Sequence, residues 1–148
     1  MKVWQGKLVC GLLAMAAVGC LPAFAASTAD EAKKQEMVMN WYREVVVFGH
    51  TELASKYMAN SFVEHDPNVG KDLASFVKRY GAGPKPIQAK LPKAPVQAFT
   101  KGDFVTLVWE HDDKDPKTST PYKYISYHIV RVKDGKIQEH WDSARVAP

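Results

Sequence analysis

Apolar and polar residues alternate along two runs near the C-terminus, and an Asp-Gly pair separates them. The first run covers residues 124–133, Asp134-Gly135 follows, and the second run covers residues 136–142. Alternation with a period of two predicts β-strands, and Asp-Gly between two such runs is a strong signal for a β-hairpin. The pattern therefore predicts an antiparallel hairpin at this end of the chain.

The register of this hairpin decides which side chains share a face, because a slip of one residue moves every side chain to the other face. A two-residue loop pairs Lys133 with Lys136 and mixes apolar and polar residues on each face. A three-residue loop with a bulge at Gly135 pairs Val132 with Lys136 and separates them, so we expect this register. The apolar face then holds Ile125, Tyr127, Ile129, Ile137 and Trp141, and the polar face holds Ser126, His128, Val130, His140 and Asp142. In this arrangement His128 lies beside His140 and diagonal to Asp142.

The preceding part of the chain has the pattern of helices followed by strands. Residues 28–48 carry apolar side chains at helical spacing, either Thr28 or Asp30 can cap this helix, and Gly49 ends it. Shorter helices are expected at residues 50–57 and 72–80, strands at 61–65, 96–99 and 104–111, and a polar loop at 112–121. This order predicts one α+β domain over residues 26–148, with N-terminal helices against one face of a curved, mixed or antiparallel sheet.

The first 25 residues have the pattern of a secretory signal peptide. Two lysines precede an apolar run over residues 8–21, which is followed by Ala23-Phe24-Ala25. We expect cleavage after Ala25 and a periplasmic or secreted protein without a membrane anchor in its mature form. The alternative is a lipoprotein anchored at Cys20, because residues 17–20 loosely resemble a lipoprotein cleavage box.

Removal of this leader also changes the chemistry that the chain offers. Both cysteines, Cys10 and Cys20, lie within it, so the mature protein has no thiol chemistry and no disulfide. The formal net charge of +4 falls to about +2, because the leader holds two lysines and no acidic residue. Such a small charge gives no argument for a nucleic-acid partner.

Three motifs resemble the SnoaL-like branch of the nuclear-transport-factor-2-like superfamily. They are Phe-Val-Glu-His-Asp-Pro-Asn at residues 62–68, Gly-Asp-Phe-Val at 102–105, and the run from Val130 to Asp142. The resemblance covers nearly all of the mature chain and implies a cone-shaped α+β barrel with a pocket at its wide end. Members of that family include cofactor-free polyketide cyclases, and relatives include isomerases, dehydratases and epoxide hydrolases.

The same resemblance implies the residues of a site. Asp142 matches the aspartate that serves as the acid-base group of the cyclases, and His65 and His128 match pocket histidines. We expect Asp142 to remove a proton next to a carbonyl group, His128 to orient it or donate to the enolate, and His65 to hold the carbonyl end. Many SnoaL-like proteins differ here by an acidic residue at position 128 and Asn at position 66. The expected substrate-binding residues are Trp41, Tyr42, Tyr57, Phe62, Phe76 and His140.

The expected ligand is a small, largely apolar carbonyl compound, and no cofactor is expected. A non-catalytic periplasmic binding module with the same pocket is the alternative of a different class. A metal site is a further alternative, because His128, His140 and Asp142 offer the three ligands that a catalytic zinc or iron uses. The resemblance argues against a metal, so none is expected.

The apolar face of the hairpin predicts an interface. If the face with His128 and Asp142 looks inward, the apolar face looks outward, and an exposed patch of this kind usually marks a contact surface. Related folds commonly pair through this surface. We therefore expect a two-fold homodimer, packed sheet on sheet, with Trp141 near its centre.

Overall fold

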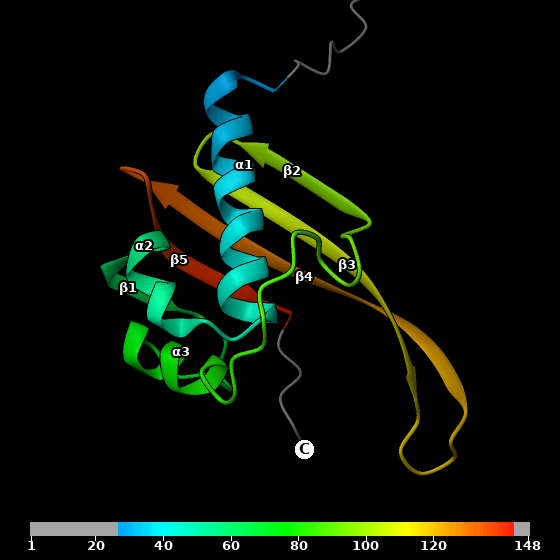
Figure 1. Cartoon of the computed structure of the whole chain (residues 1–148). Helices are drawn as coiled ribbons and strands as arrows, with labels where there is room; N and C mark the ends of the chain where they lie inside the picture. Colours follow the sequence, from blue (N-terminus) through cyan, green and yellow to red (C-terminus); the bar gives the residue numbers. More distant parts are fainter. Residues whose placement is uncertain (1–26, 144–148) are drawn as a thin grey trace, which may run out of the picture.

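The computed structural model describes residues 27–143, which form a five-stranded mixed sheet with helices over one face (Figure 1). The predicted signal peptide, with Cys10 and Cys20, lies outside the described residues. In chain order the elements are α1 (Ala29–Trp41), the π-helix η1 (Tyr42–Val47), the 3-10 helix η2 (Thr51–Leu53), α2 (Ala54–Tyr57), β1 (Met58–Glu64), α3 (Leu73–Tyr80), β2 (Gln97–Lys101), β3 (Phe104–Lys114), β4 (Pro121–Lys133) and β5 (Lys136–Asp142). The strand order is β1-β5-β4-β3-β2, in which β1 and β5 are parallel and the other neighbours are antiparallel. The α+β prediction is confirmed.

The first helix begins at a capping box and ends in a distorted turn. The Thr28 hydroxyl accepts a hydrogen bond from the Glu31 backbone N–H, and the Glu31 carboxylate accepts one from the Thr28 backbone N–H. The predicted helix continues beyond α1 as the π-helix η1, which contains three consecutive β-branched valines. Gly49 then leaves the helix with a φ of 75°. Within residues 27–143, no helix is long and apolar enough to cross a membrane.

The helices cover what we call the inner face of the sheet, and the core lies between them. Val105, Leu107 and Trp109 of β3 are buried there, as their alternation predicts. Trp41 of α1 packs against Phe76 of α3, with ring centroids 5.8 Å apart. In Figure 1, α1 crosses this face of the sheet, and α2 and α3 lie beside β1.

The loop of the β4–β5 hairpin differs from the prediction. Asp134 and Gly135 have φ angles of 53° and 69°, and Lys133 pairs with Lys136. Two consecutive residues with positive φ form the two-residue loop that suits a twisted hairpin. The predicted three-residue loop is therefore wrong.

A β-bulge in β5 separates apolar from polar residues in this hairpin. Val132 pairs with Ile137 but Arg131 pairs with Glu139, so Gln138 is the extra residue. Ile137 consequently lies on the inner face, where it is fully buried, and the prediction that it shares the apolar outer face is wrong. The bulge explains why the two-residue loop does not mix the faces beyond it.

The β3–β4 hairpin is longer than predicted. Its pairing runs from Phe104–Arg131 to Lys114–Pro121, so residues 112–114 and 121 of the expected polar loop at residues 112–121 are strand. Six residues, 115–120, connect the strands, and the Asp115 carboxylate accepts hydrogen bonds from the backbone N–H groups of Lys117 and Thr118. In Figure 1 this hairpin extends well beyond the helices.

Candidate functional site

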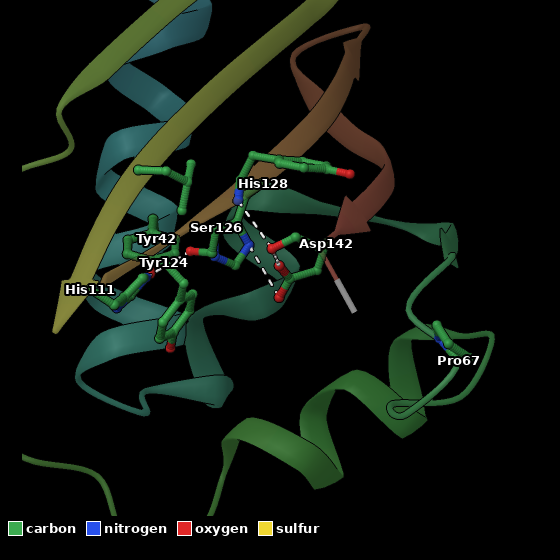
Figure 2. A pocket seen from close by; sticks show the side chains of 10 residues that line it. Tyr42, Pro67, His111, Tyr124, Ser126, His128 and Asp142 are labelled. Carbon is green, nitrogen blue, oxygen red and sulfur yellow. Dashed lines mark hydrogen bonds and ion pairs between the residues drawn. The ribbon is translucent and has the colours of Figure 1, made fainter. Parts of the chain in front are cut away.

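A cavity of about 760 Å³ opens on the inner face where β5 ends and β4 continues. We call it the trough. Figure 2 shows His128 and Asp142 facing each other at its wall, with Pro67 on a separate loop. The residues that line it come from η1, β3, β4, the end of β5 and the loop after β1: Tyr42, Pro67, His111, Tyr124, Ile125, Ser126, Tyr127, His128, Asp142 and Ser143.

Strand alternation supplies most of one wall. Tyr124, Ser126 and His128 are two residues apart on β4 and therefore point to the same face. His111 of β3 lies opposite Tyr124, its ring stacks on that tyrosine with centroids 4.7 Å apart, and its Nε2 lies 2.7 Å from Oγ of Ser126. His111 was not among the expected site residues, although its alternation with the buried Trp109 indicates the inner face.

Asp142 is the acidic group of the trough. It pairs directly with His128 across β5 and β4, and Oδ2 of Asp142 lies 3.7 Å from Nδ1 of His128. The predicted register placed His128 beside His140 instead, which is wrong, although all three residues share the predicted face. Burial raises the pKa of the Asp142 carboxyl above its ordinary value.

Burial acts in the opposite direction on His128. Burial, followed by the nearby His140 and His111, lowers the pKa of the His128 imidazole to about 3. His128 is therefore neutral over the ordinary pH range. The trough thus combines a carboxyl group whose pKa is raised with an imidazole whose pKa is lowered.

Tyr42 provides a hydroxyl group to the trough. Its ring packs edge-on against His128 with centroids 4.9 Å apart, and it stacks on Trp109. Burial, followed by the charge of Asp142, raises the pKa of Tyr42 to about 12. The hydroxyl therefore keeps its proton and can donate a hydrogen bond to an oxygen atom in the trough.

His140 and Glu64 lie behind His128 rather than in the trough wall. Nε2 of His140 lies 2.9 Å from Nδ1 of His128, and Nδ1 of His140 lies 2.8 Å from Oε2 of Glu64. The expected substrate-binding role of His140 does not fit this position, because its side chain is only 1% exposed. Glu64 was missed in the sequence, although its alternation with the buried Phe62 indicates the inner face.

His65 lies on the opposite face of the sheet. Its ring stacks on Trp141 with centroids 4.5 Å apart, and its Nε2 lies 2.9 Å from Oε2 of Glu139. Side chains alternate between the two faces of a strand, so Glu64 at the end of β1 points inward and the next residue, His65, points outward. The prediction that His65 holds the carbonyl end of a ligand beside Asp142 is therefore wrong in its placement.

The aromatic residues expected to bind the ligand divide between wall and core. Tyr42 lines the trough. Trp41, Tyr57, Phe62 and Phe76 are each less than 5% exposed and belong to the core behind it. These four side chains support the site by packing, because none of them is among the residues that line the trough.

One group of side chains in residues 27–143 has the composition of a metal site. Ligand atoms of His128, His140 and Asp142 all lie within 4.8 Å of one another. The two imidazole rings are nearly coplanar, at 11°, and their nitrogens face each other at 2.9 Å. This is the geometry of an N–H···N hydrogen bond, and a cation bound by both rings would require them to turn.

No family model and no curated protein matches the sequence. Solved structures match its fold. A candidate polyketide cyclase from Acidithiobacillus ferrooxidans is 24% identical, with a TM-score of 0.50 over 74% of this chain and 86% of its own. A candidate SnoaL-like polyketide cyclase from Jannaschia sp. is 12% identical, with a TM-score of 0.56 over 80% of this chain and 91% of its own. A Catenulispora acidiphila protein with a ketosteroid isomerase-like fold is 14% identical, with a TM-score of 0.50 over 75% of this chain and 86% of its own.

Proposed function

We propose that this chain, which has the SnoaL-like fold, is a cofactor-independent acid-base enzyme of the aldol cyclase, isomerase or lyase type. Its substrate is a small, largely apolar carbonyl compound that binds in the trough. Two of the proteins with this fold are candidate polyketide cyclases, which agrees with such chemistry. The residues around Asp142 carry the proposal.

The main evidence for this proposal is the pair formed by Asp142 and His128. Asp142 removes a proton from the carbon next to the carbonyl group, and the electrons of the broken C–H bond move onto the carbonyl oxygen. The protonated hydroxyl of Tyr42 stabilises this developing enolate. Neutral His128 exchanges a second proton, which aldol, elimination and isomerisation reactions require.

The raised pKa of Asp142 supports its role as the base. A carboxylate with an ordinary pKa is a weak base, whereas a higher pKa brings its proton affinity closer to the working pH. The trough provides this environment because Asp142 is partly buried, with a side chain 20% exposed, and still reaches the cavity.

The test is exchange of carbon-bound protons in deuterium oxide. Nuclear magnetic resonance of a panel of small ketones should show that the wild type accelerates exchange next to the carbonyl group. Asp142→Asn should reduce the rate by about 100-fold or more, the contribution of a general base. Asp112→Asn is the matched control, because its carboxylate is exposed and paired with Lys123 outside the trough. Ligand binding without exchange in the wild type would instead identify a non-catalytic receptacle.

We also propose that the protein is exported. The predicted signal peptide supports this proposal through its two lysines, its apolar run and the Ala23-Phe24-Ala25 site. The intact mass of the exported protein is expected to correspond to a chain that begins at Ala26. A chain that begins at Cys20 and carries the added mass of lipid would show a membrane-anchored lipoprotein instead.

A further inference from the structure

A glutamate behind the trough is completely buried. The Glu64 side chain is 0% exposed, and its Oε1 accepts hydrogen bonds from the backbone N–H groups of His65 and Asp66 at 3.0 Å each. Its Oε2 lies 2.8 Å from Nδ1 of His140, and its Oε1 lies 3.0 Å from the same nitrogen. A buried charge is costly even when it is paired, and an apolar residue often serves stability equally well. The carboxylate therefore indicates a role directed at His140.

The contacts of Glu64 determine where the protons lie on two histidines. An ionised carboxylate only accepts hydrogen bonds, so Nδ1 of His140 carries the proton in this contact. In neutral His140, Nε2 is then unprotonated and accepts a hydrogen bond from Nδ1 of His128, 2.9 Å away. Neutral His128 consequently holds its proton on Nδ1 and leaves Nε2 with a free lone pair.

The two imidazoles are aligned for proton transfer. Their planes differ by 11° and their centroids are 5.2 Å apart, although the facing nitrogens are separated by only 2.9 Å. Such a large centroid distance with such a short nitrogen contact means that the rings meet edge to edge rather than face to face. Among residues 27–143, Nε2 of His128 has no hydrogen-bond partner, and this ring lines the trough.

We propose that Glu64, His140 and His128 form a proton relay that serves the trough, with Glu64 as its positioning residue. The inference rests on the acid-base function proposed above, and it assigns a hydroxyl group to the carbonyl substrate. When Nε2 of His128 takes the proton of that hydroxyl, the proton on Nδ1 of His128 passes to Nε2 of His140. His128 is neutral again, and His140 keeps its Nδ1 proton and carries the positive charge. The reverse transfers return the proton to the substrate.

The relay solves the problem of placing a positive charge. A charge that remained on His128 would be costly, because burial lowers the pKa of this imidazole to about 3. On His140 the same charge lies next to the Glu64 carboxylate, whose Oε2 is 2.8 Å from Nδ1. The attraction between two opposite charges at this distance offsets part of the cost of burying them.

Glu64→Gln should invert both tautomers while it keeps the shape of the side chain. The amide oxygen takes the place of Oε1, because that position accepts two backbone N–H groups. The amide NH₂ then takes the place of Oε2, the oxygen nearer to Nδ1 of His140, and donates to this nitrogen, so we expect Nδ1 to be unprotonated. His140 then donates from Nε2 to Nδ1 of His128, and the His128 proton moves to Nε2.

Nitrogen magnetic resonance of protein with isotope-labelled histidine distinguishes protonated from unprotonated ring nitrogens. In the wild type we expect protonated Nδ1 in both His128 and His140, and in Glu64→Gln protonated Nε2 in both. Glu139→Gln is the matched control, because it removes the carboxylate of another Glu–His pair, with His65 at 2.9 Å, on the outer face. It should leave the tautomers of His128 and His140 unchanged.

Activity gives a second readout with a small β-hydroxy ketone as the probe. Glu64→Gln should slow retro-aldol cleavage, which needs the hydroxyl proton, by about 100-fold and should slow exchange next to the carbonyl group much less. A wild-type His128 protonated on Nε2, or a Glu64→Gln variant that keeps the wild-type tautomers or full cleavage activity, would overturn the relay. Because Asp142→Asn tests exchange separately, full cleavage by Glu64→Gln alongside lost exchange in Asp142→Asn would leave the proposed function intact.

Discussion

Oδ2 of Asp142 lies 3.7 Å from Nδ1 of His128, across the last residue pair that β5 shares with β4. Burial raises the pKa of the carboxyl group and lowers the pKa of the imidazole. Two neighbouring groups whose pKa values are shifted in opposite directions by their environment are a typical acid-base arrangement. The acid-base chemistry of the trough wall thus depends on one cross-strand pair.

The first prediction concerns the interdependence of this pair. Asp142→Asn and His128→Asn should each strongly reduce retro-aldol cleavage of a small β-hydroxy ketone, which needs both groups. The double variant should lose much less than the product of the two single effects, because groups that act as a unit are not additive. Initial rates of cleavage provide the measurement, and unfolding midpoints verify that all three variants fold. Independent, multiplicative losses would contradict a shared mechanism.

The second prediction concerns stability and pH. In the folded chain His128 becomes protonated only near pH 3, whereas in the unfolded chain it becomes protonated near pH 6.5. The contribution of His128 to the free energy of unfolding is therefore fully present above pH 6.5. It decreases as the pH falls, by up to about 1.4 kcal/mol per pH unit. Denaturant titrations between pH 6.5 and pH 5 should show this loss. His128→Asn should flatten the slope.

Asp142→Asn is the control for this pH dependence. The raised pKa of Asp142 has the opposite effect on stability: the folded chain binds this proton at a higher pH than the unfolded chain, so acidification favours the folded state at this residue. Removing Asp142 should therefore make the loss of stability on acidification steeper. A slope that His128→Asn leaves unchanged would show that this imidazole is protonated in the folded protein.

Alternation along β4 predicted the shared face of the site despite an incorrect register. The predicted partner of His128 was His140 and the observed partner is Asp142, a shift of two residues. A shift of two leaves the face of each side chain unchanged, because side chains alternate with a period of two. Ile137 lies before the bulge at Gln138, and its predicted face is wrong for that reason. The residue pattern contains no signal that fixes the position of this bulge.

The buried partner of the site was harder to predict than its wall. Glu64 contacts His140 only because β1 lies parallel to β5, and these strands are more than 70 residues apart in sequence. Charged residues are rarely buried, so composition indicates an exposed position for Glu64. The same alternation that turns Glu64 inward turns His65 outward. Knowing which residues of β1 point inward would have corrected the predicted positions of both Glu64 and His65.

The third prediction tests the face of Ile137. This side chain is fully buried on the inner face, so Ile137→Ala should reduce the free energy of unfolding by about 2–5 kcal/mol. Ile87→Ala is the matched control, because Ile87 is 43% exposed, and it should change stability by less than about 0.5 kcal/mol. Urea titrations of both variants give the comparison. Equal effects would contradict the observed bulge.

The last prediction concerns the outer face of the sheet, which the helices leave uncovered. Large apolar side chains are exposed there, including Phe104 at 45%, Ile125 at 55% and Tyr127 at 44%. A hollow of about 400 Å³ on this face is lined by Phe104, Tyr127, Ile129, Trp141 and Asp142. Exposed apolar surface of this kind favours association, and a flat sheet face can pack against its own copy around a two-fold axis. We therefore expect a homodimer in which the outer faces of two chains meet near Trp141.

Ile129→Lys tests this dimer, because in a two-fold contact one substitution places a charge on both sides. Unpaired charge buried in an interface is strongly unfavourable, so the variant should be a monomer where the wild type is a dimer. Ile87→Lys is the matched control: it makes the same change at an exposed isoleucine of the loop between α3 and β2 and should leave the dimer intact. Light scattering at micromolar concentration measures the mass of all three proteins. A monomeric wild type would refute pairing through this face, and the trough would be unaffected because Asp142 and His128 both come from one chain.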